Sequence, residues 1–143
     1  MWLPDTNVWI QYLNPPPSPV KRRLRTHPIE QIVLCDVVKA ELYYGAFKSS
    51  RQEANLALVD NLCREFSSRS FDEPAARRFG EIRAQLARQG TPIGPYDFQI
   101  AAIALANDCI LVTHNTTEFS RVPNLRLEDW ELIPLAGLGG EIT

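Results

Sequence analysis

Residues 1–13, MWLPDTNVWIQYL, join a short apolar run to a stretch with helical periodicity. Residues 1–3 are apolar, and Asp5 follows them after a single proline. Apolar side chains then recur at the spacing of one helix face, at Val8, Trp9, Tyr12 and Leu13. The pattern predicts a strand, an acidic turn and a helix. Prolines at residues 15–17 must end that helix, because proline lacks the amide donor.

The same alternation of strand and helix continues along the chain. A continuous apolar run at residues 32–35 is typical of a parallel strand covered on both faces. Residues 109–113 form another predicted strand, and residues 125–127 a shorter one. Helical patterns occupy the intervals around residues 37–44, 56–66, 75–86 and 98–105. Strands that alternate with helices predict an α/β fold, with a mostly parallel central sheet and helices on both of its faces.

Some predicted helices have recognisable ends. Asp72 and Gly90 bound the helix around residues 75–86, since aspartate is favoured at the N-cap and glycine just past the last turn. Asp36 is placed to cap the helix that follows the strand at residues 32–35.

Length and composition fit one domain and limit the possible partners. With 143 residues, 45% of them hydrophobic, we expect one domain over residues 1–133 and a flexible tail over residues 134–143. A net charge of -2 excludes a uniformly basic, nucleic-acid-coating protein, so any nucleic-acid contact must be local. The three cysteines form no C-x-x-C pair, and neither an export signal nor a membrane-spanning run is recognisable. We therefore expect a cytoplasmic protein that does not contact a membrane.

Acidic residues follow the predicted strands or open the predicted helices. Because the carboxyl ends of parallel strands meet at one edge of the sheet, we expect Asp5, Asp97 and Glu118 to lie there together. Asn115 follows the strand at residues 109–113 and belongs to the same edge. Glu41 lies on a helix face that is otherwise apolar, where an unpartnered carboxylate would cost several kcal/mol of desolvation. Glu41 is therefore expected to meet a cation.

Each of these residues also suits an ordinary structural role. Asp5 could cap a helix, Asp97 could interact with the dipole of the buried helix, and Glu41 could form a structural ion pair. The pattern Asn115-x-x-Glu118 fits a capping box, which would also fix Glu118 at the sheet edge. Only the combination of these acids indicates a site.

Carboxylates from distant stretches of chain suit a hard divalent cation. Mg²⁺ and Mn²⁺ prefer oxygen ligands and tolerate bound water, and no cysteine or histidine cluster in the sequence favours a softer metal. One or two such ions neutralise the charge that develops on a phosphodiester and lower the pKa of the attacking water. The sequence thus predicts metal-dependent cleavage of phosphodiesters.

Polar and basic residues near the acids are candidates for contact with such a substrate. Hydrogen bonds to a phosphate could come from four residues that also suit ordinary turns, namely Thr6, Asn7, Thr113 and Asn115. Residues 21–25, KRRLR, form the densest basic cluster. Within it, Arg22 and Arg23 either follow an RNA backbone or are simply solvated.

Four motifs stand in a characteristic order and spacing. They are Leu3-Pro4-Asp5-Thr6-Asn7, Val38-Lys39-Ala40-Glu41-Leu42 with Gly45, Ile93-Gly94-Pro95-Tyr96-Asp97 with Ala101-Ala102, and Leu111-Val112-Thr113-His114-Asn115 with Glu118-Phe119. Together they resemble the PIN-domain ribonucleases, specifically the VapC toxins of bacterial toxin-antitoxin pairs. The resemblance extends over the chain as far as Trp130.

The resemblance implies a three-layer α/β/α sandwich and a Mg²⁺- or Mn²⁺-dependent endoribonuclease. It implies Asp5, Glu41 and Asp97 as the metal ligands, and adds Asn115 and Glu118 to the catalytic set. Asn115 stands where many members of the family have aspartate, which leaves open whether a second metal is held without RNA. Pro4 stands where an aliphatic residue is usual, and a strand end accommodates it.

The resemblance also implies partners: an RNA substrate, with tRNA among the candidates, a cognate antitoxin lying across the catalytic cleft, and a second copy in a homodimer. The replacement at Asn115 keeps open a catalytically degenerate module that binds RNA or protein. A phosphatase using Asp5 is disfavoured because Asn7 replaces the second aspartate of its motif. A receiver-like switch lacks its late lysine, and a P-loop lacks the G-K-[ST] sequence.

Overall fold

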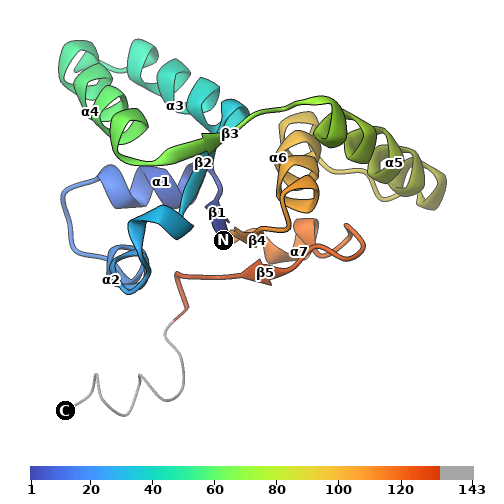
Figure 1. Ribbon diagram of the computed structural model, residues 1–143. Coiled ribbons are helices and arrows are strands. Elements are labelled where there is room, and N and C mark those ends of the chain that lie inside the picture. The colour runs from blue at the N-terminus through green and yellow to red at the C-terminus, as the bar shows by residue number, and fades with distance from the viewer. Residues whose placement is uncertain (133–143) are drawn as a thin grey trace.

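The computed structural model describes residues 1–132, which form an α/β fold (Figure 1). Its strands are β1 (Trp2–Pro4), β2 (Val33–Cys35), β3 (Ser67–Arg69), β4 (Ile110–Val112) and β5 (Leu127–Glu128). β1 pairs with β4, β4 with β5, and β2 with β3, and a bridge between Trp2 and Ile32 joins the two groups. The strand order is therefore β3-β2-β1-β4-β5, and every one of these pairings is parallel.

Helices cover both sides of this sheet. They are α1 (Thr6–Leu13), α2 (Pro19–Arg25), α3 (Asp36–Lys48), α4 (Gln52–Glu65), α5 (Glu73–Gln89), α6 (Pro95–Ala106) and α7 (Thr116–Phe119), with a 3-10 turn at Ile29–Gln31. In Figure 1, α1 to α4 lie on one side of the strands and α5 to α7 on the other. The expected three-layer α/β/α arrangement around a parallel sheet is confirmed.

Helix α6 is buried on nearly all sides, as its apolar sequence predicts. Residues 100–104 are at most 2% exposed, and the helix contacts α5, α3 and β4. Because neighbours hold α6 from several directions, its first turn is fixed against the edge of the sheet. That turn carries Asp97.

Trp9 anchors the layer on the other side of the sheet. Its side chain is fully buried, and its ring packs edge-on against Phe66 at 4.9 Å and against Tyr12 at 5.7 Å between ring centroids. Phe66 directly follows α4. The periodic apolar residues of α1 therefore form core contacts that hold α1 against the end of α4.

Two helix ends follow from the sequence. Asp72 accepts a hydrogen bond from the amide of Ala75 at 3.1 Å, and Gly90 adopts a φ of 70° just after the last turn of α5. Both predicted ends of α5 are confirmed. At the start of α2, the side chain of Ser18 accepts from the amide of Lys21 at 3.2 Å.

Two local expectations are wrong, and one strand was not expected. Asp36 is the first residue of α3 rather than its cap, and its Oδ2 accepts from the amide of Phe71 at 3.1 Å. Strand β3 was not expected, because its sequence Ser-Ser-Arg is polar and pairs only with β2 at the sheet edge. The last strand begins at Leu127 and includes Glu128, instead of spanning residues 125–127.

The expected tail at residues 134–143 and the expected boundary at residue 133 lie outside the described residues. Within residues 1–132, no helix is both long and apolar enough to cross a membrane. All three cysteines are free thiols, with Cys35 and Cys109 buried.

Candidate active site

Asp5 lies at the carboxyl end of β1, and the fold uses it as a helix cap. Its Oδ1 accepts from the amide of Val8 at 3.1 Å, and its own amide donates to the carbonyl of Val112 at 2.9 Å. Only 8% of Asp5 is exposed. Burial raises the pKa of Asp5, nearby Glu131 and Glu41 add to the rise, and hydrogen bonds from Thr113 and Val8 oppose it. The capping role and a role in a site therefore coexist at Asp5.

Asp97 lies in the first turn of α6 and is half-buried. Its pKa is raised to about 6 by burial, then by the charge of Glu118 and its hydrogen bond with that residue, and then by the charges of Asp5 and Glu41. Oδ2 of Asp97 lies next to Gly94, 3.4 Å from where a Cβ atom would be, so the carboxylate folds back over the start of α6. The charges of Glu118, Asp5 and Glu41 all raise the pKa of Asp97, and we call the four carboxylates of Asp5, Glu41, Asp97 and Glu118 the acidic cluster.

Glu41 reaches this region from α3 and is held by α1. The hydroxyl of Thr6 donates to its Oε1 at 2.6 Å. Within residues 1–132, Glu41 forms no ion pair with a lysine or arginine. The structural ion pair considered from the sequence is therefore absent among these residues, where Thr6 is the only hydrogen-bond donor to this carboxylate.

Asn115 and Glu118 do not form the expected capping box. The amide of Asn115 donates instead to the hydroxyl of Thr113 at 3.0 Å, and its side chain donates to Oε2 of Glu118 at 2.8 Å. The other oxygen of Glu118 accepts from the amide of Gly94 at 3.0 Å. These bonds lower the pKa of Glu118, with the bond from Asn115 as the largest cause. Glu118 is thus held ionised beside Asp97.

The acidic cluster is open rather than tightly closed. Within residues 1–132, one group of three potential metal-binding side chains has all its ligand atoms within 4.8 Å of one another, and it is not Asp5, Glu41 and Asp97. The four carboxylates of the acidic cluster offer only oxygen ligands. The donor set fits a hard dication.

The compact group is His114, Asp129 and Glu131, which the sequence reasoning missed. Nδ1 of His114 lies 3.0 Å from Oδ2 of Asp129 and 3.8 Å from Oε2 of Glu131. The hydrogen bond with Asp129 is the largest cause that raises the pKa of His114. Asp129 also accepts from the amide of Glu131 at 2.9 Å. The signal in the sequence was the acidic run that follows the last strand, at the same sheet edge.

A cavity of about 420 Å³ joins this histidine group to the acidic cluster. It is lined by Asp5, Asn7, Ile10, Gln11, His114, Asn115 and Glu131. Of the four residues predicted to bind phosphate, two line this cavity and two contact carboxylates instead. Asn7 and Asn115 are exposed and line the cavity, Thr6 binds Glu41, and Thr113 is fully buried beside Asp5.

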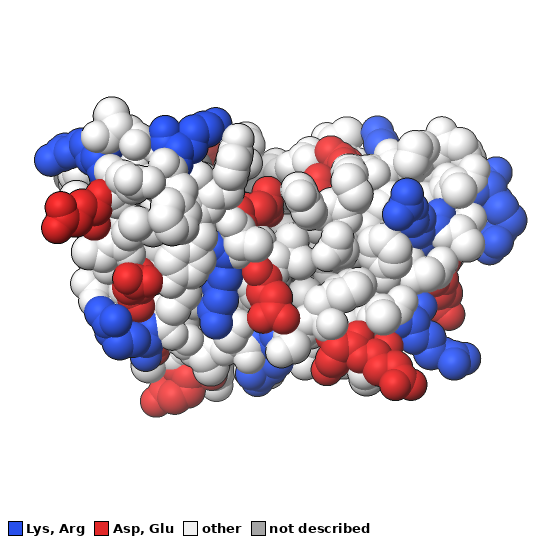
Figure 2. Space-filling view, turned by 90° about the horizontal axis from the view of Figure 1, so that it is seen from above, with Lys and Arg blue, Asp and Glu red and all other residues white. Residues whose placement is uncertain are grey.

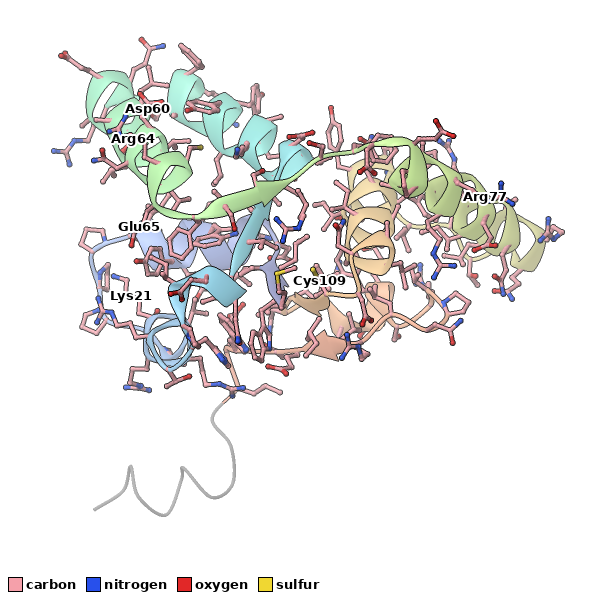
Figure 3. The ribbon with its side chains drawn as sticks, in the orientation of Figure 1. Lys21, Asp60, Arg64, Glu65, Arg77 and Cys109 are labelled. Atoms are coloured by element: carbon pink, nitrogen blue, oxygen red, sulfur yellow. The ribbon has the colours of Figure 1, made fainter. Side chains whose placement is uncertain are left out.

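The basic residues predicted to contact RNA, which belong to the segment 21–25, do not line this cavity. Lys21 lies in the first turn of α2 (Figure 3), and its ammonium donates to the carbonyls of Asn14 and Pro16, so it holds the proline loop against this helix. Arg23 lies 3.5 Å from Glu128, and Arg22 is exposed. Figure 2 shows lysine and arginine scattered over one face and interspersed with acids, without a single basic track there.

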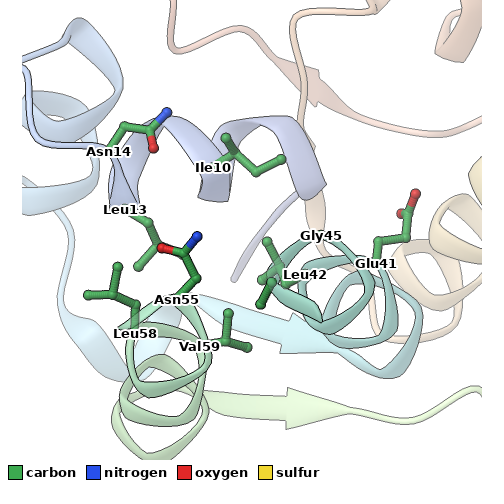
Figure 4. Close-up of a pocket in the computed structure, with 10 residues that line it drawn as sticks. Ile10, Leu13, Asn14, Glu41, Leu42, Gly45, Asn55, Leu58 and Val59 are labelled. Atoms are coloured by element: carbon green, nitrogen blue, oxygen red, sulfur yellow. The ribbon is translucent and has the colours of Figure 1, made fainter. Parts of the chain in front are cut away.

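An apolar groove leads away from Glu41 between α1, α3 and α4 (Figure 4). Its volume is about 220 Å³, and its apolar walls are Ile10, Leu13, Leu42, Ala46, Leu58 and Val59. Glu41 lies at one end, apart from the apolar side chains. Leu58 and Ile10 are 43% and 42% exposed, so a sizeable apolar surface adjoins the acidic cluster.

Comparison with known proteins agrees with this geometry. Residues 2–125 match the family model described as PIN domain. The chain is 41% identical over 126 residues to a protein of Shigella flexneri named tRNA(fMet)-specific endonuclease VapC, covering 88% of this chain and 95% of that one. It is 36% identical over the same length to Ribonuclease VapC2 of Haemophilus influenzae, again covering 88% and 95%.

Solved structures give the same result. A DNA-bound VapBC from Salmonella typhimurium superposes with a TM-score of 0.84 at 38% identity, covering 90% of this chain and 97% of that chain. VapBC2 from Rickettsia felis, bound to a fragment of promoter DNA, superposes with a TM-score of 0.84 at 33% identity, covering 90% and 98%. This chain belongs to the PIN-domain family and, within it, to the VapC proteins.

Proposed function

We propose that this protein is a metal-dependent endoribonuclease that acts as the toxin of a toxin-antitoxin pair. The observation that carries the proposal is a pair of contacts that bring carboxylates from distant parts of the chain to one sheet edge. Thr6, next to Asp5, binds Glu41, and Glu118 accepts from the amide of Gly94 at the start of α6, whose first turn carries Asp97. RNA as the substrate is supported by relatives named as ribonucleases, and tRNA by those named as tRNA(fMet)-specific.

The residues that would hold the metal are Asp5, Glu41 and Asp97. Mg²⁺ or Mn²⁺, as one or two ions, would supply charge neutralisation at the phosphodiester and a water of lowered pKa. The all-oxygen donor set supports these ions over softer metals.

The remaining residues of the site keep these carboxylates in position and ionised. Thr6 orients Glu41, and the amide of Val8 orients Asp5. Asn115 and Gly94 hold Glu118 in its charged form beside Asp97, where it accepts a proton less readily than its neighbour. Asn115 therefore keeps Glu118 ionised, so a carboxylate remains at this place although Asn115 itself carries no charge. This supports an active enzyme over a degenerate module.

Exposed groups at the rim are suited to contact the substrate. The side-chain amides of Asn7 and Asn115 line the cavity next to Asp5 and can donate to phosphate oxygens. Thr6 and Thr113 hydrogen-bond to carboxylates of the site and are not expected to contact the substrate. Arg22 and Arg23 do not line this cavity, so they would contact RNA farther from the cut.

The partner that restrains this activity would be an antitoxin segment in the apolar groove between α1, α3 and α4. The groove ends at Glu41, so a chain bound there would reach the acidic cluster. Relatives with this fold were solved as VapBC assemblies. A homodimer is also proposed, on the resemblance alone.

The test is cleavage of RNA by the purified protein with Mn²⁺, with Mg²⁺ and with a chelator. Wild-type protein is expected to cut RNA only when a metal is present. The Asp97→Asn variant should have a cleavage rate at least about a hundredfold lower. The control variant Glu53→Gln, which changes an exposed acid on α4, should cut at the wild-type rate. RNA binding without cleavage across a broad RNA set would favour the degenerate module. Cleavage that Asp97→Asn leaves unchanged would refute the assignment.

A further inference from the structure

A second cavity opens beside the acidic cluster and has no role in the function proposed above. Its volume is about 610 Å³, and its walls come from α1, α3, the segment after β3, and α6. Glu41, one of the four carboxylates of the acidic cluster, lines this cavity, so the cavity adjoins the cluster at that residue. A molecule bound at the carboxylates would therefore extend directly into it.

Two exposed tyrosines form the open sides of this cavity. Tyr44 is 66% exposed and lies one helical turn after Glu41, and Tyr96 is 58% exposed and directly precedes Asp97. Phe71 lines it as well, and its ring is fixed edge-on against Phe79 at 5.8 Å and 88°. Aromatic area left open next to a polar site indicates a surface that another molecule covers.

Polar groups in the cavity suit a nucleotide. Gln99 lies one turn after Tyr96 on α6, and its side-chain amide forms no hydrogen bond with any residue between 1 and 132. The amide therefore offers a free donor and a free acceptor. The ammonium of Lys48 lies 5.2 Å from the ring centroid of Tyr44, which places a positive charge at the outer rim.

We propose that this cavity is a base pocket, which takes the nucleobase of an unpaired nucleotide next to the scissile phosphate. The inference rests on the proposed ribonuclease function. Tyr44 and Tyr96 supply stacking, which tolerates any base, while the amide of Gln99 contacts the edge of the base and sets a preference. A protein segment could also cover exposed rings, but the adjoining Glu41 and the free amide favour the nucleotide.

The first experiment maps cleavage of a random-sequence single-stranded RNA pool by the full-length protein with Mn²⁺, with sequencing of the new ends. Wild type is expected to prefer one base, or a pair of bases, at a position beside the cut. Gln99→Ala is expected to flatten that preference. Phe47→Ala, which removes a 59% exposed ring of α3 outside the cavity, should reproduce the wild-type preference.

The second experiment measures KM and kcat on an oligonucleotide taken from the most frequently cut sequence. Tyr44→Ala and Tyr96→Ala are each expected to raise KM roughly tenfold, as the loss of one base stack does, and Tyr96→Phe to restore it. Wild type should have the same raised KM on an oligonucleotide that is abasic at the preferred position. On that oligonucleotide, the tyrosine variants should not raise KM further.

The outcomes separate the two proposals. If wild type cuts no RNA, the ribonuclease function fails and the base pocket falls with it. If wild type cuts RNA while both alanine variants keep KM and base preference, the base pocket alone is overturned. Loss of self-association in light scattering by these variants, with unchanged kinetics, would likewise overturn it by identifying the rings as a protein contact.

Discussion

Asp97 carries a proton more readily in the folded protein than in the unfolded chain. Its pKa is about 6 in the fold against an ordinary 3.8, so the metal-free protein loses stability as pH rises from about 4 through 6. Below that window the carboxyl is neutral in both states, and above it the folded state retains a repelled charge. The ionised carboxylate of Asp97 therefore destabilises the metal-free fold, and the same negative charge is available to bind a cation.

Asp97→Asn should therefore stabilise the metal-free protein at neutral pH. We expect a melting temperature about 2 to 4 °C above wild type at pH 7.5 in chelator, the size of change that roughly 1 kcal/mol produces in such a domain. Scanning calorimetry of both proteins should show this difference shrinking toward zero near pH 4. A difference that does not vary with pH would contradict the assigned cause.

Asp5 has two separable roles, which two substitutions distinguish. Asparagine still caps α1, so Asp5→Asn should melt no lower than wild type while losing RNA cleavage. Alanine cannot accept from the amide of Val8, so Asp5→Ala should lose cleavage and about 1 kcal/mol of stability relative to Asp5→Asn. Denaturant unfolding of the two variants measures the difference. Equal stabilities would show that the cap contributes nothing.

For single residues, the acids of the site could be predicted from the sequence, but not all of their hydrogen-bond partners. Asp5, Glu41, Asp97 and Glu118 were predictable because a carboxylate beside a strand end or on an apolar helix face is conspicuous. The bond from Thr6 to Glu41 was not, since it joins residues 35 positions apart. His114 and Asp129 were missed for a related reason: their contact depends on where β5 ends, and the strand was expected to end at residue 127 instead of Glu128.

Among the elements, the helices follow most directly from local sequence. The ends of α5 were predictable because Asp72 and Gly90 act through backbone geometry and hydrogen bonds within a few residues. Strand β3 was not, because its polar residues 67–69 form a strand only by pairing with β2. The burial of α6 was predictable from composition, and that burial is what fixes Asp97.

Two glycines of α5 provide a test of this helix. Gly90 has a φ of 70°, a region that costs other residues about 1 kcal/mol or more, so Gly90→Ala should lower the free energy of unfolding by that amount. Gly80 lies in the helix interior, and nothing within 4 Å would meet an added Cβ. Gly80→Ala should raise stability by about 0.5 to 1 kcal/mol. Urea unfolding that gives both variants the same sign would contradict the assigned helix end.

The whole molecule brings carboxylates together that the chain keeps far apart. The parallel order of the sheet places Asp5 after a central strand, and the helices on each side supply Glu41 from α3 and Asp97 from α6. The apolar groove and the proposed base pocket both open at Glu41. One position on the surface is thereby accessible to a metal, an RNA and a regulatory chain.

The most direct test is titration of the purified protein with Mn²⁺ at pH 7.5, followed by isothermal calorimetry or by the electron paramagnetic resonance signal of free Mn²⁺. Wild type should bind Mn²⁺, while Asp5→Asn, Glu41→Gln and Asp97→Asn should each weaken binding at least tenfold, since each removes a ligand from one shared site. The exposed acid variant Glu53→Gln should bind as wild type does. If all three site variants bind Mn²⁺ as tightly as wild type, the carboxylates do not share an ion and the account is contradicted.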